Sequence, residues 1–241
     1  MKWLLNLIAC SAFGGTLDGE TIARILEKHF SAFLLYDVEA RAITAGRGMD
    51  SGLLQAGSLL KPFLALTHAG KEFPVATCDG RRCWRRQGHG RVNLDRALAF
   101  SCNQYFLGLA ATIDAEQLRV LMRSYGVEVP LLDTAEARIG LGTAALVSPK
   151  QLISAYAEMF HRGRELPVWH GLLLAATSGT ANRFQGKVLA KTGTAACSRD
   201  EGDGLVVIGF PVQRVRWAVL VREHRVPGST VAGRLAKVLE L

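Results

Sequence analysis

The chain has 241 residues, 49% of them hydrophobic and 21% charged, which excludes a disordered or fibrous protein and predicts a sizeable core. No repeat or long linker divides it, so we expect residues 16–241 to form one domain. The net charge is +8, and five arginines lie close together: Arg81, Arg82, Arg85, Arg86 and Arg91. We interpret them as a solvated basic loop and expect no nucleic-acid binding, because Trp84 is the only interleaved aromatic residue.

The first 15 residues admit two interpretations. Lys2 and the short apolar run after it resemble an export signal, and residues 7–10 loosely fit a lipoprotein cleavage box. Asn6 interrupts the apolar run, so a first amphipathic helix is an equal alternative. The signal would imply an extracytoplasmic protein, with the N-terminus as a membrane anchor. No later segment is expected to span a bilayer.

The first predicted elements are a helix from about Gly19 to His29 and then a hairpin of two strands, over 32–38 and 41–44. Further helices are predicted over 94–100 and 115–125, with Asn93 and Asp114 as their N-caps.

A longer helix is predicted to begin after Ser148. Ser148 is a good N-cap, Pro149 suits the first helical position, and Gln151 completes a capping box. Gly163 ends the apolar periodicity.

The C-terminal third returns to strands, predicted over 188–195, 204–211 and 215–222, and Ser229 is expected to cap a last helix that runs to Leu241. This order predicts an α+β fold. A central antiparallel sheet would combine N- and C-terminal strands and pack against a helical block and flanking helices.

Five cysteines make an odd count: Cys10, Cys78, Cys83, Cys102 and Cys197. Cys78 and Cys83 are separated by a turn-like spacer and are the predicted disulfide, with two free thiols as the alternative. His89 nearby raises a zinc alternative, but the sequence offers no evident fourth ligand. We therefore expect no metal and no cofactor.

Ser58 and Lys61 are candidate catalytic residues. Three residues apart on a helix, they would share one face. A serine hydroxyl needs an adjacent base, and a lysine can serve only if burial or a neighbouring positive charge lowers its pKa. Lys191 could supply that charge.

Two later segments add polar groups. Ser101-Cys102-Asn103 lies between two predicted helices, where a hydroxyl can relay a proton and an amide can orient a substrate. Lys191-Thr192-Gly193-Thr194 lies in a predicted strand, where lysine and hydroxyls would bind a carboxylate and Gly193 would let a ligand backbone approach.

Serine-x-x-lysine, serine-x-asparagine and lysine-threonine-glycine, in this order, resemble the three motifs of penicillin-binding proteins and serine β-lactamases. Other stretches resemble class B penicillin-binding transpeptidases: residues 78–84, 88–90, 97–106, 139–142, 148–152 and 178–181. The resemblance extends from about residue 32 to the C-terminus.

The resemblance implies roles for these residues. Ser58 would be acylated, Lys61 and Ser101 would handle protons, and Asn103 would position the acyl amide. Lys191, Thr192 and Thr194 would hold the substrate carboxylate, and the backbone N–H groups of Ser58 and Thr194 would form an oxyanion hole.

The implied activity is that of a D,D-transpeptidase or D,D-carboxypeptidase acting on D-Ala-D-Ala stem peptides of peptidoglycan. A β-lactamase is the first alternative, although no Glu-x-x-Leu-Asn segment is present and Asn103 stands where class D enzymes usually have valine. A β-lactam or peptidoglycan sensor with little turnover is the second alternative.

Expected partners are stem peptides, β-lactams and other cell-wall proteins. The chain is too short for the full membrane anchor and pedestal domain of the larger members.

Overall fold

The structure is a computed model that describes four ranges of the chain: 17–50, 52–129, 131–196 and 202–241. The predicted signal segment, Cys10 and Cys197 lie outside these ranges. Within them, no helix is both long enough and apolar enough to cross a membrane.

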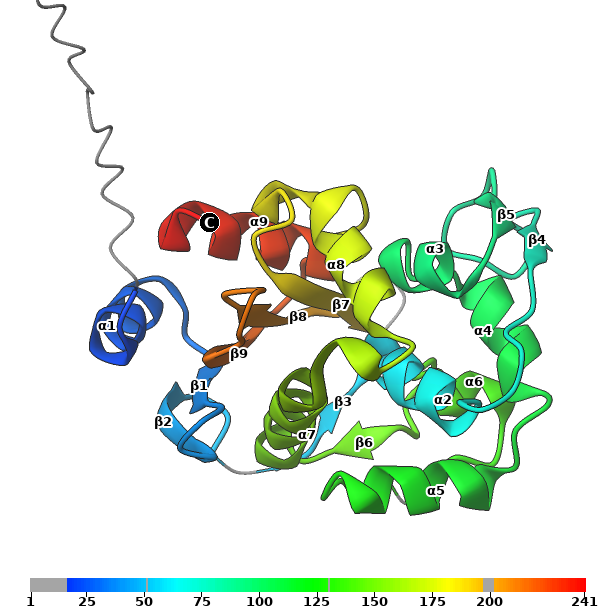
Figure 1. Cartoon of the computed structure of the whole chain (residues 1–241), viewed down its shortest axis with the longest axis horizontal. Helices are drawn as coiled ribbons and strands as arrows, with labels where there is room; N and C mark the ends of the chain where they lie inside the picture. Colours follow the sequence, from blue (N-terminus) through cyan, green and yellow to red (C-terminus); the bar gives the residue numbers. More distant parts are fainter. Residues whose placement is uncertain (1–16, 51, 130, 197–201) are drawn as a thin grey trace, which may run out of the picture.

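Five antiparallel strands form the central sheet, in the order β2-β1-β9-β8-β7 (Figure 1). They are β1 (Phe33–Asp37), β2 (Ala42–Arg47), β7 (Leu189–Ala196), β8 (Gly202–Phe210) and β9 (Trp217–Glu223). Leu35 of β1 lies opposite Val219 of β9, so the N-terminal hairpin joins the C-terminal strands. The predicted α+β fold and its composite sheet are confirmed.

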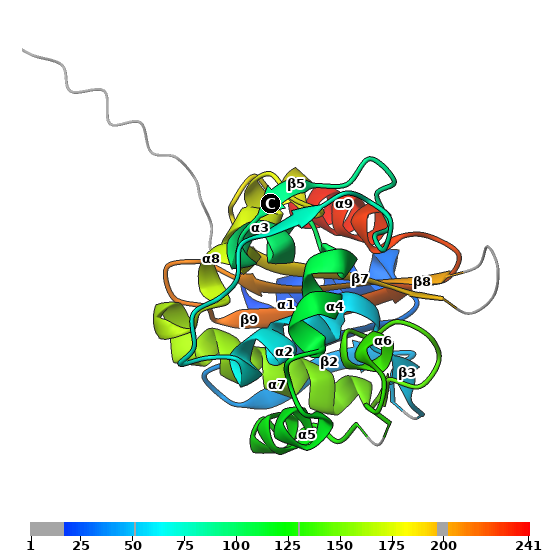
Figure 2. The same ribbon diagram turned by 90° about the vertical axis from the view of Figure 1, so that its right-hand side faces the viewer.

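Helices cover both faces of this sheet. On one face lie α1 (Gly19–His29) and α9 (Gly228–Leu239), which bury Leu26 and Leu235 against the strands. On the other lies α7 (Pro149–Arg162), with part of the helical block beyond it. Figure 2 shows the sheet edge-on, with α8 (Trp169–Thr177) and α9 above it and α7 and α5 (Ala115–Ser124) below it. Strand β1 is buried at every position because both of its faces are covered.

The helical block contains α2 (Lys61–Thr67), α3 (Leu94–Ala99), α4 (Asn103–Ala110), α5 (Ala115–Ser124), α6 (Ala135–Arg138) and α8 (Trp169–Thr177). Three 3₁₀ turns accompany it: η1 (Gly57–Leu60), η2 (Gly163–Glu165) and η3 (Asn182–Phe184). Two small antiparallel pairs complete the fold, β3 (Leu54–Gln55) with β6 (Leu146–Val147) and β4 (Ala76–Cys78) with β5 (Gly90–Val92).

Three predicted N-caps are confirmed. The side chains of Asn93, Asp114 and Ser148 each accept a hydrogen bond from a backbone N–H in the first turn of the helix that follows. Gly163 ends α7 with a positive φ of 76°, as a glycine at that position allows.

The predicted cap of the last helix is wrong. Helix α9 begins at Gly228, and Pro227 is its N-cap residue, without a side-chain cap. The N–H of Gly228 donates instead to the Thr194 hydroxyl at 3.1 Å. A Cβ on Gly228 would lie 2.2 Å from the Gly193 carbonyl oxygen. Close packing on β7 therefore fixes the start of α9, and Ser229 lies inside its first turn.

Candidate active site

Ser58 lies in η1, the 3₁₀ turn that leads directly into α2 at Lys61. Side chains three apart nearly eclipse in a 3₁₀ turn, so the two residues project from the same side. The hydroxyl of Tyr156, fully buried in α7, donates to the Leu59 carbonyl at 2.8 Å and anchors the turn. Ser58 thus stays partly exposed while Lys61 is fully buried.

Glycines allow this turn to lie against β7. Gly57 has a φ of 54°, and a Cβ there would approach the backbone of Thr194 to 3.0 Å. A Cβ on Gly140 would lie only 1.7 Å from the Gly57 carbonyl oxygen. The residue before Ser58 is therefore held between two backbone segments, which brings η1 to β7 at Thr194.

The Lys61 amine donates hydrogen bonds to oxygen atoms of the protein. Its Nζ donates to Asn103 Oδ1 at 2.6 Å, to the Ser101 carbonyl at 2.8 Å and to Ser101 Oγ at 3.2 Å. No carboxylate contacts it within the described ranges. Burial lowers the pKa of Lys61 to about 7, although Cys102 and Cys83 oppose the shift. Burial, rather than the expected charge of Lys191, is therefore the main cause.

Ser101 and Asn103 lie at the corner between α3 and α4. Ser101 adopts a positive φ of 51°, a left-handed conformation that is strained for any residue other than glycine. The Cys102 N–H donates to the Ala97 carbonyl at 2.9 Å and helps to hold the corner. This strained conformation places the Ser101 hydroxyl between two lysines.

Lys191, on β7, is the second of these lysines. Its Nζ donates to Ser101 Oγ at 3.0 Å and to the Thr192 carbonyl at 2.7 Å. Burial, and then the charge of Lys61, hold the pKa of Lys191 well below its usual range. Two ammonium groups that share one hydroxyl repel each other, so this lysine network (Lys61, Lys191, Ser101 and Asn103) disfavours carrying both charges.

A cleft of about 330 Å³ opens beside the lysine network. It is lined by Ser58, Trp84, Ser101, Asn103, Leu141, Thr180, Thr192, Gly193, Thr194, Pro227 and Ser229. Six of the predicted site residues thus share one cleft, and the two lysines lie buried behind its wall. Within the described part of the chain, no hydrogen bond of Ser58 with Lys61 is formed.

Several cleft residues carried no predicted role. Thr180 is one: its hydroxyl accepts a hydrogen bond from the Thr192 hydroxyl at 2.6 Å. The family-like stretch 178–181 was the available signal. Leu141 lies in another family-like stretch, 139–142, whereas Pro227 and Ser229 come from a segment that only the fold brings to the cleft.

Packing inside the protein gives a reason for the missing side chain at Gly193 that the sequence analysis did not predict. A Cβ there would meet the Leu59 side chain at 3.2 Å and the Ala56 carbonyl at 3.3 Å. The missing side chain therefore makes room for the segment around η1 beside β7. The approach of a ligand backbone to Gly193, which lines the cleft, stays a prediction.

The predicted disulfide between Cys78 and Cys83 is absent, and both are free thiols, as is Cys102. The sulfurs of Cys78 and Cys83 lie 3.6 and 3.5 Å from the same ring nitrogen, Nδ1 of His89. Each sulfur thus faces the imidazole. The hydrogen bond with Cys102 is the main cause that lowers the pKa of Cys83.

Cys102 supplies the fourth group that the sequence did not place. Its sulfur lies 4.0 Å from that of Cys83, and the four ligand atoms of Cys78, Cys83, His89 and Cys102 all lie within 4.8 Å of one another. A tetrahedral zinc site with Zn–S bonds of about 2.3 Å and a Zn–N bond of about 2.0 Å needs separations of roughly 3.5–3.8 Å. This thiol cluster could therefore hold Zn²⁺, and it would tie the β4–β5 loop to the corner that carries Ser101 and Asn103.

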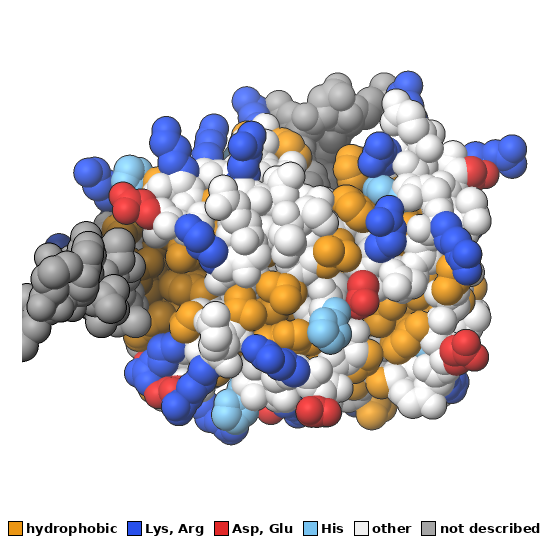
Figure 3. Space-filling model, turned by 45° about the horizontal axis from the view of Figure 1, so that its top comes forward, with side chains coloured by type: hydrophobic (Ala, Val, Ile, Leu, Met, Phe, Trp, Pro, Cys, Tyr) orange, Lys and Arg blue, Asp and Glu red, His pale blue; other side chains and the backbone are white. Residues whose placement is uncertain are grey.

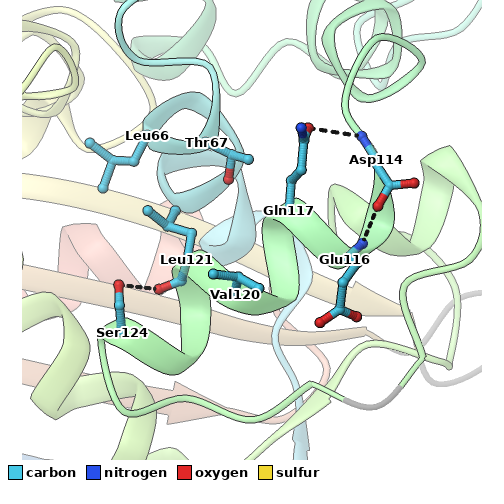
Figure 4. Close-up of a pocket in the computed structure, with 8 residues that line it drawn as sticks. All are labelled: Leu66, Thr67, Asp114, Glu116, Gln117, Val120, Leu121 and Ser124. Carbon is cyan, nitrogen blue, oxygen red and sulfur yellow. Dashed lines mark hydrogen bonds between the residues drawn. The ribbon is translucent and has the colours of Figure 1, made fainter.

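A larger hollow of about 690 Å³ lies between α2 and α5 (Figure 4). Its polar groups are occupied locally: Asp114 accepts from the Glu116 N–H, Gln117 bonds back to the Asp114 N–H, and Ser124 donates to the Leu121 carbonyl. It contains no nucleophile next to a base. The smaller cleft is therefore the candidate site.

Basic side chains are spread over the face shown in Figure 3, with apolar patches between them. This distribution agrees with the net charge of +8.

Residues 55–172 match the family model of the penicillin binding protein transpeptidase domain. This segment contains Ser58, Lys61, Ser101 and Asn103 and ends before Lys191. Over 45 residues the chain is 40% identical to the peptidoglycan D,D-transpeptidase MrdA of Acinetobacter baumannii, an alignment that covers 19% of this chain and 7% of that protein.

Solved structures share the fold at lower identity. The penicillin-binding protein PBP2 of Pseudomonas aeruginosa superposes with a TM-score of 0.74 at 19% identity, over 92% of this chain and 75% of that one. PBP2 of Helicobacter pylori, in a complex with MreC, gives 0.78 at 18% identity, over 90% and 60%.

The transpeptidase domain of FtsI4 from Legionella pneumophila gives a TM-score of 0.69 at 18% identity, over 94% of this chain and 97% of that domain. The chain thus spans an isolated transpeptidase domain but only part of the longer relatives. In sequence over residues 55–172, and in fold over most of its length, this chain resembles the penicillin-binding protein transpeptidase family.

Proposed function

We propose that this chain is the catalytic domain of a peptidoglycan D,D-transpeptidase, which forms an acyl-enzyme at Ser58. One observation carries the proposal: Ser58 shares a cleft with Ser101, Asn103 and Thr192, and a lysine with a pKa of about 7 lies behind that cleft. An amine with that pKa is partly neutral near pH 7, so it can accept a proton there.

The first chemical step is acylation. Ser58 Oγ attacks the carbonyl carbon between the two D-alanines, and its proton passes to the neutral Lys61 amine. Contacts of this kind commonly tighten only when substrate binds, so the absence of a Ser58–Lys61 hydrogen bond in the free protein is compatible with the role. The backbone N–H groups of Ser58 and Thr194 stabilise the oxyanion, which the approach of η1 to β7 favours.

The C–N bond then breaks, and D-alanine leaves with a proton delivered through the Ser101 hydroxyl. That hydroxyl contacts both lysines, so it can pass a proton between Lys61 and the leaving amine. An amine of a second stem peptide attacks the ester, forms the cross-link and restores Ser58. Attack by water instead would make the protein a D,D-carboxypeptidase.

Thr192 and Thr194 bind the terminal carboxylate of the substrate in this proposal, and Lys191 acts from behind them. A bound carboxylate favours the charged form of a nearby amine, so substrate binding would raise the lowered pKa of Lys191. Lys191 would therefore become positively charged only when the substrate carboxylate is bound beside it.

A labelled-penicillin experiment tests the proposal. The purified chain is incubated with a fluorescent penicillin, the modified residue is identified by mass spectrometry, and loss of the adduct is timed. We expect a slowly lost adduct on Ser58, its absence in Ser58→Ala, and D-alanine release from a D-Ala-D-Ala peptide. Rapid loss would indicate a β-lactamase, and slow loss without peptide turnover would indicate a sensor. No adduct on Ser58 would overturn the proposal.

The proposed setting is extracytoplasmic, in a periplasm or at a cell surface, because the peptidoglycan substrate is there. The solved complex of H. pylori PBP2 with MreC makes other cell-wall proteins reasonable partners for this chain too. Membrane association would come through the N-terminal residues, and export of a tagged full-length chain tests this location.

A further inference from the structure

Trp84 stands out among the large apolar side chains that the structure leaves exposed. Its side chain is 58% exposed, and it is the only one of these exposed residues in the described ranges that lines the candidate cleft. It lies in the loop between β4 and β5, directly after Cys83. Exposure of an indole in a reaction cleft gives a ligand an apolar surface to cover.

This indole is held in a fixed orientation. Its Nε1 donates to the Phe100 carbonyl at 3.1 Å. Its ring packs edge-on against His89, with centroids 5.4 Å apart, and His89 in turn stacks on Phe100 at 5.8 Å. A ring held in this way loses little freedom when a ligand contacts it, unlike a mobile surface aromatic.

The position of Trp84 indicates which part of a ligand it meets. Its hydrogen bond joins it to the end of α3, one residue before Ser101, so it belongs to the wall that carries Asn103. Strand β7 lines another part of the cleft, where Thr192 and Thr194 would hold the carboxylate of the leaving residue, whereas Asn103 would position the acyl amide. Trp84 therefore lies on the side of the acyl group.

The positive charges next to Trp84 in the chain disfavour one class of acyl group, those with a cationic side chain. Arg85 and Arg86 follow Trp84 in the chain and are exposed, so a cationic group close to the indole would be repelled. An uncharged hydrocarbon side chain meets no such repulsion and gains by covering the ring.

We propose that Trp84 is a specificity-determining residue that contacts the acyl side chain of the donor and favours hydrocarbon groups there. The proposal rests on the acyl-enzyme function proposed above. It assigns no chemical step to Trp84, whose ring only selects among donors.

Two β-lactams with one nucleus test it: benzylpenicillin, which has an aromatic acyl side chain, and 6-aminopenicillanic acid, which has none. Second-order rate constants for acylation of Ser58 are measured in the full chain, in Trp84→Ala and Trp84→Phe, and in Val120→Ala as a control. Val120 is 57% exposed on α5 and lines the separate hollow. Thermal unfolding of each variant is recorded alongside.

We expect Trp84→Ala to slow acylation by benzylpenicillin by roughly three- to tenfold, the usual effect of one aromatic contact, and to leave 6-aminopenicillanic acid unchanged. Trp84→Phe should recover most of the difference, and Val120→Ala should match the wild type. An unchanged ratio of the two rate constants in Trp84→Ala would overturn the proposal, and so would an equal slowing of both, since that pattern means a structural role. Absence of any wild-type adduct would instead overturn the proposed function itself.

Discussion

The lysine network and the thiol cluster share one corner of the chain, Ser101-Cys102-Asn103, and they are built in contrasting ways. In the network, the two amines donate to hydroxyl, amide and carbonyl oxygens of the protein. In the cluster, three sulfurs and a ring nitrogen face one another, and His89 Nε2 has no partner in the described part of the chain. The two amines of the network therefore have hydrogen-bond acceptors within the protein. The four ligand atoms of the cluster could instead all bind one metal ion.

The contrast suggests that the lysine network serves the reaction and that the thiol cluster serves the stability of the fold. Burying two lysines without a carboxylate destabilises the fold and lowers their pKa values, which suits proton transfer by Lys61 and carboxylate binding by Lys191. A zinc ion bound by three thiolates and a histidine would instead stabilise the fold, because the unfolded chain offers no such site. Cys102 lies between Ser101 and Asn103, so the cluster would hold the corner that the network uses.

The largest expected effect comes from removing the base. Lys61→Met should lower the rate of acylation by roughly 10²–10⁴-fold, the range for loss of a general base. Its melting temperature should stay level or rise, since methionine removes a buried amine at similar volume. Lys237→Met, on α9, is the control. Wild-type acylation by a folded Lys61→Met protein would rule out the assigned base.

Metal removal should have the next largest effect. The purified protein should contain about one zinc per chain by elemental analysis, and chelation should lower the melting temperature and slow acylation through the Ser101–Asn103 corner. His89→Ala should lose the metal, whereas His68→Ala, whose ring packs on Phe73 elsewhere, should keep it. If the metal-reconstituted wild type binds no zinc, the cluster is a set of free thiols.

A smaller effect should appear on changing pH. Acylation should speed up as pH rises through about 7, because only the neutral Lys61 amine accepts the serine proton. The free energy of unfolding should also rise from about pH 7 to the ordinary value of 10.5, since in that range the unfolded chain binds the Lys61 proton more tightly. Rate constants from pH 5 to 9 check the first point. A flat profile would contradict it.

Local sequence signals predicted the elements well but predicted the site only in part. Asp114 and Ser148 act through neighbours within three residues, so their caps could be found from spacing alone. The fourth member of the thiol cluster could not, because Cys102 reaches Cys83 only after α3 packs beside the β4–β5 loop. The charge state of Lys61 was equally hidden, since burial depends on side chains from the whole block.

The smallest predicted effect compares two serines near helix starts. Ser148→Ala should cost about 1 kcal/mol of unfolding free energy, because the side chain accepts a hydrogen bond from the Gln151 N–H. Ser229→Ala should cost close to nothing, because Gly228 begins α9 and its N–H is bound by Thr194. Urea unfolding of both variants gives the difference. Equal losses would show that the start of α9 depends on its serine after all, and that contact with β7 is not what fixes it.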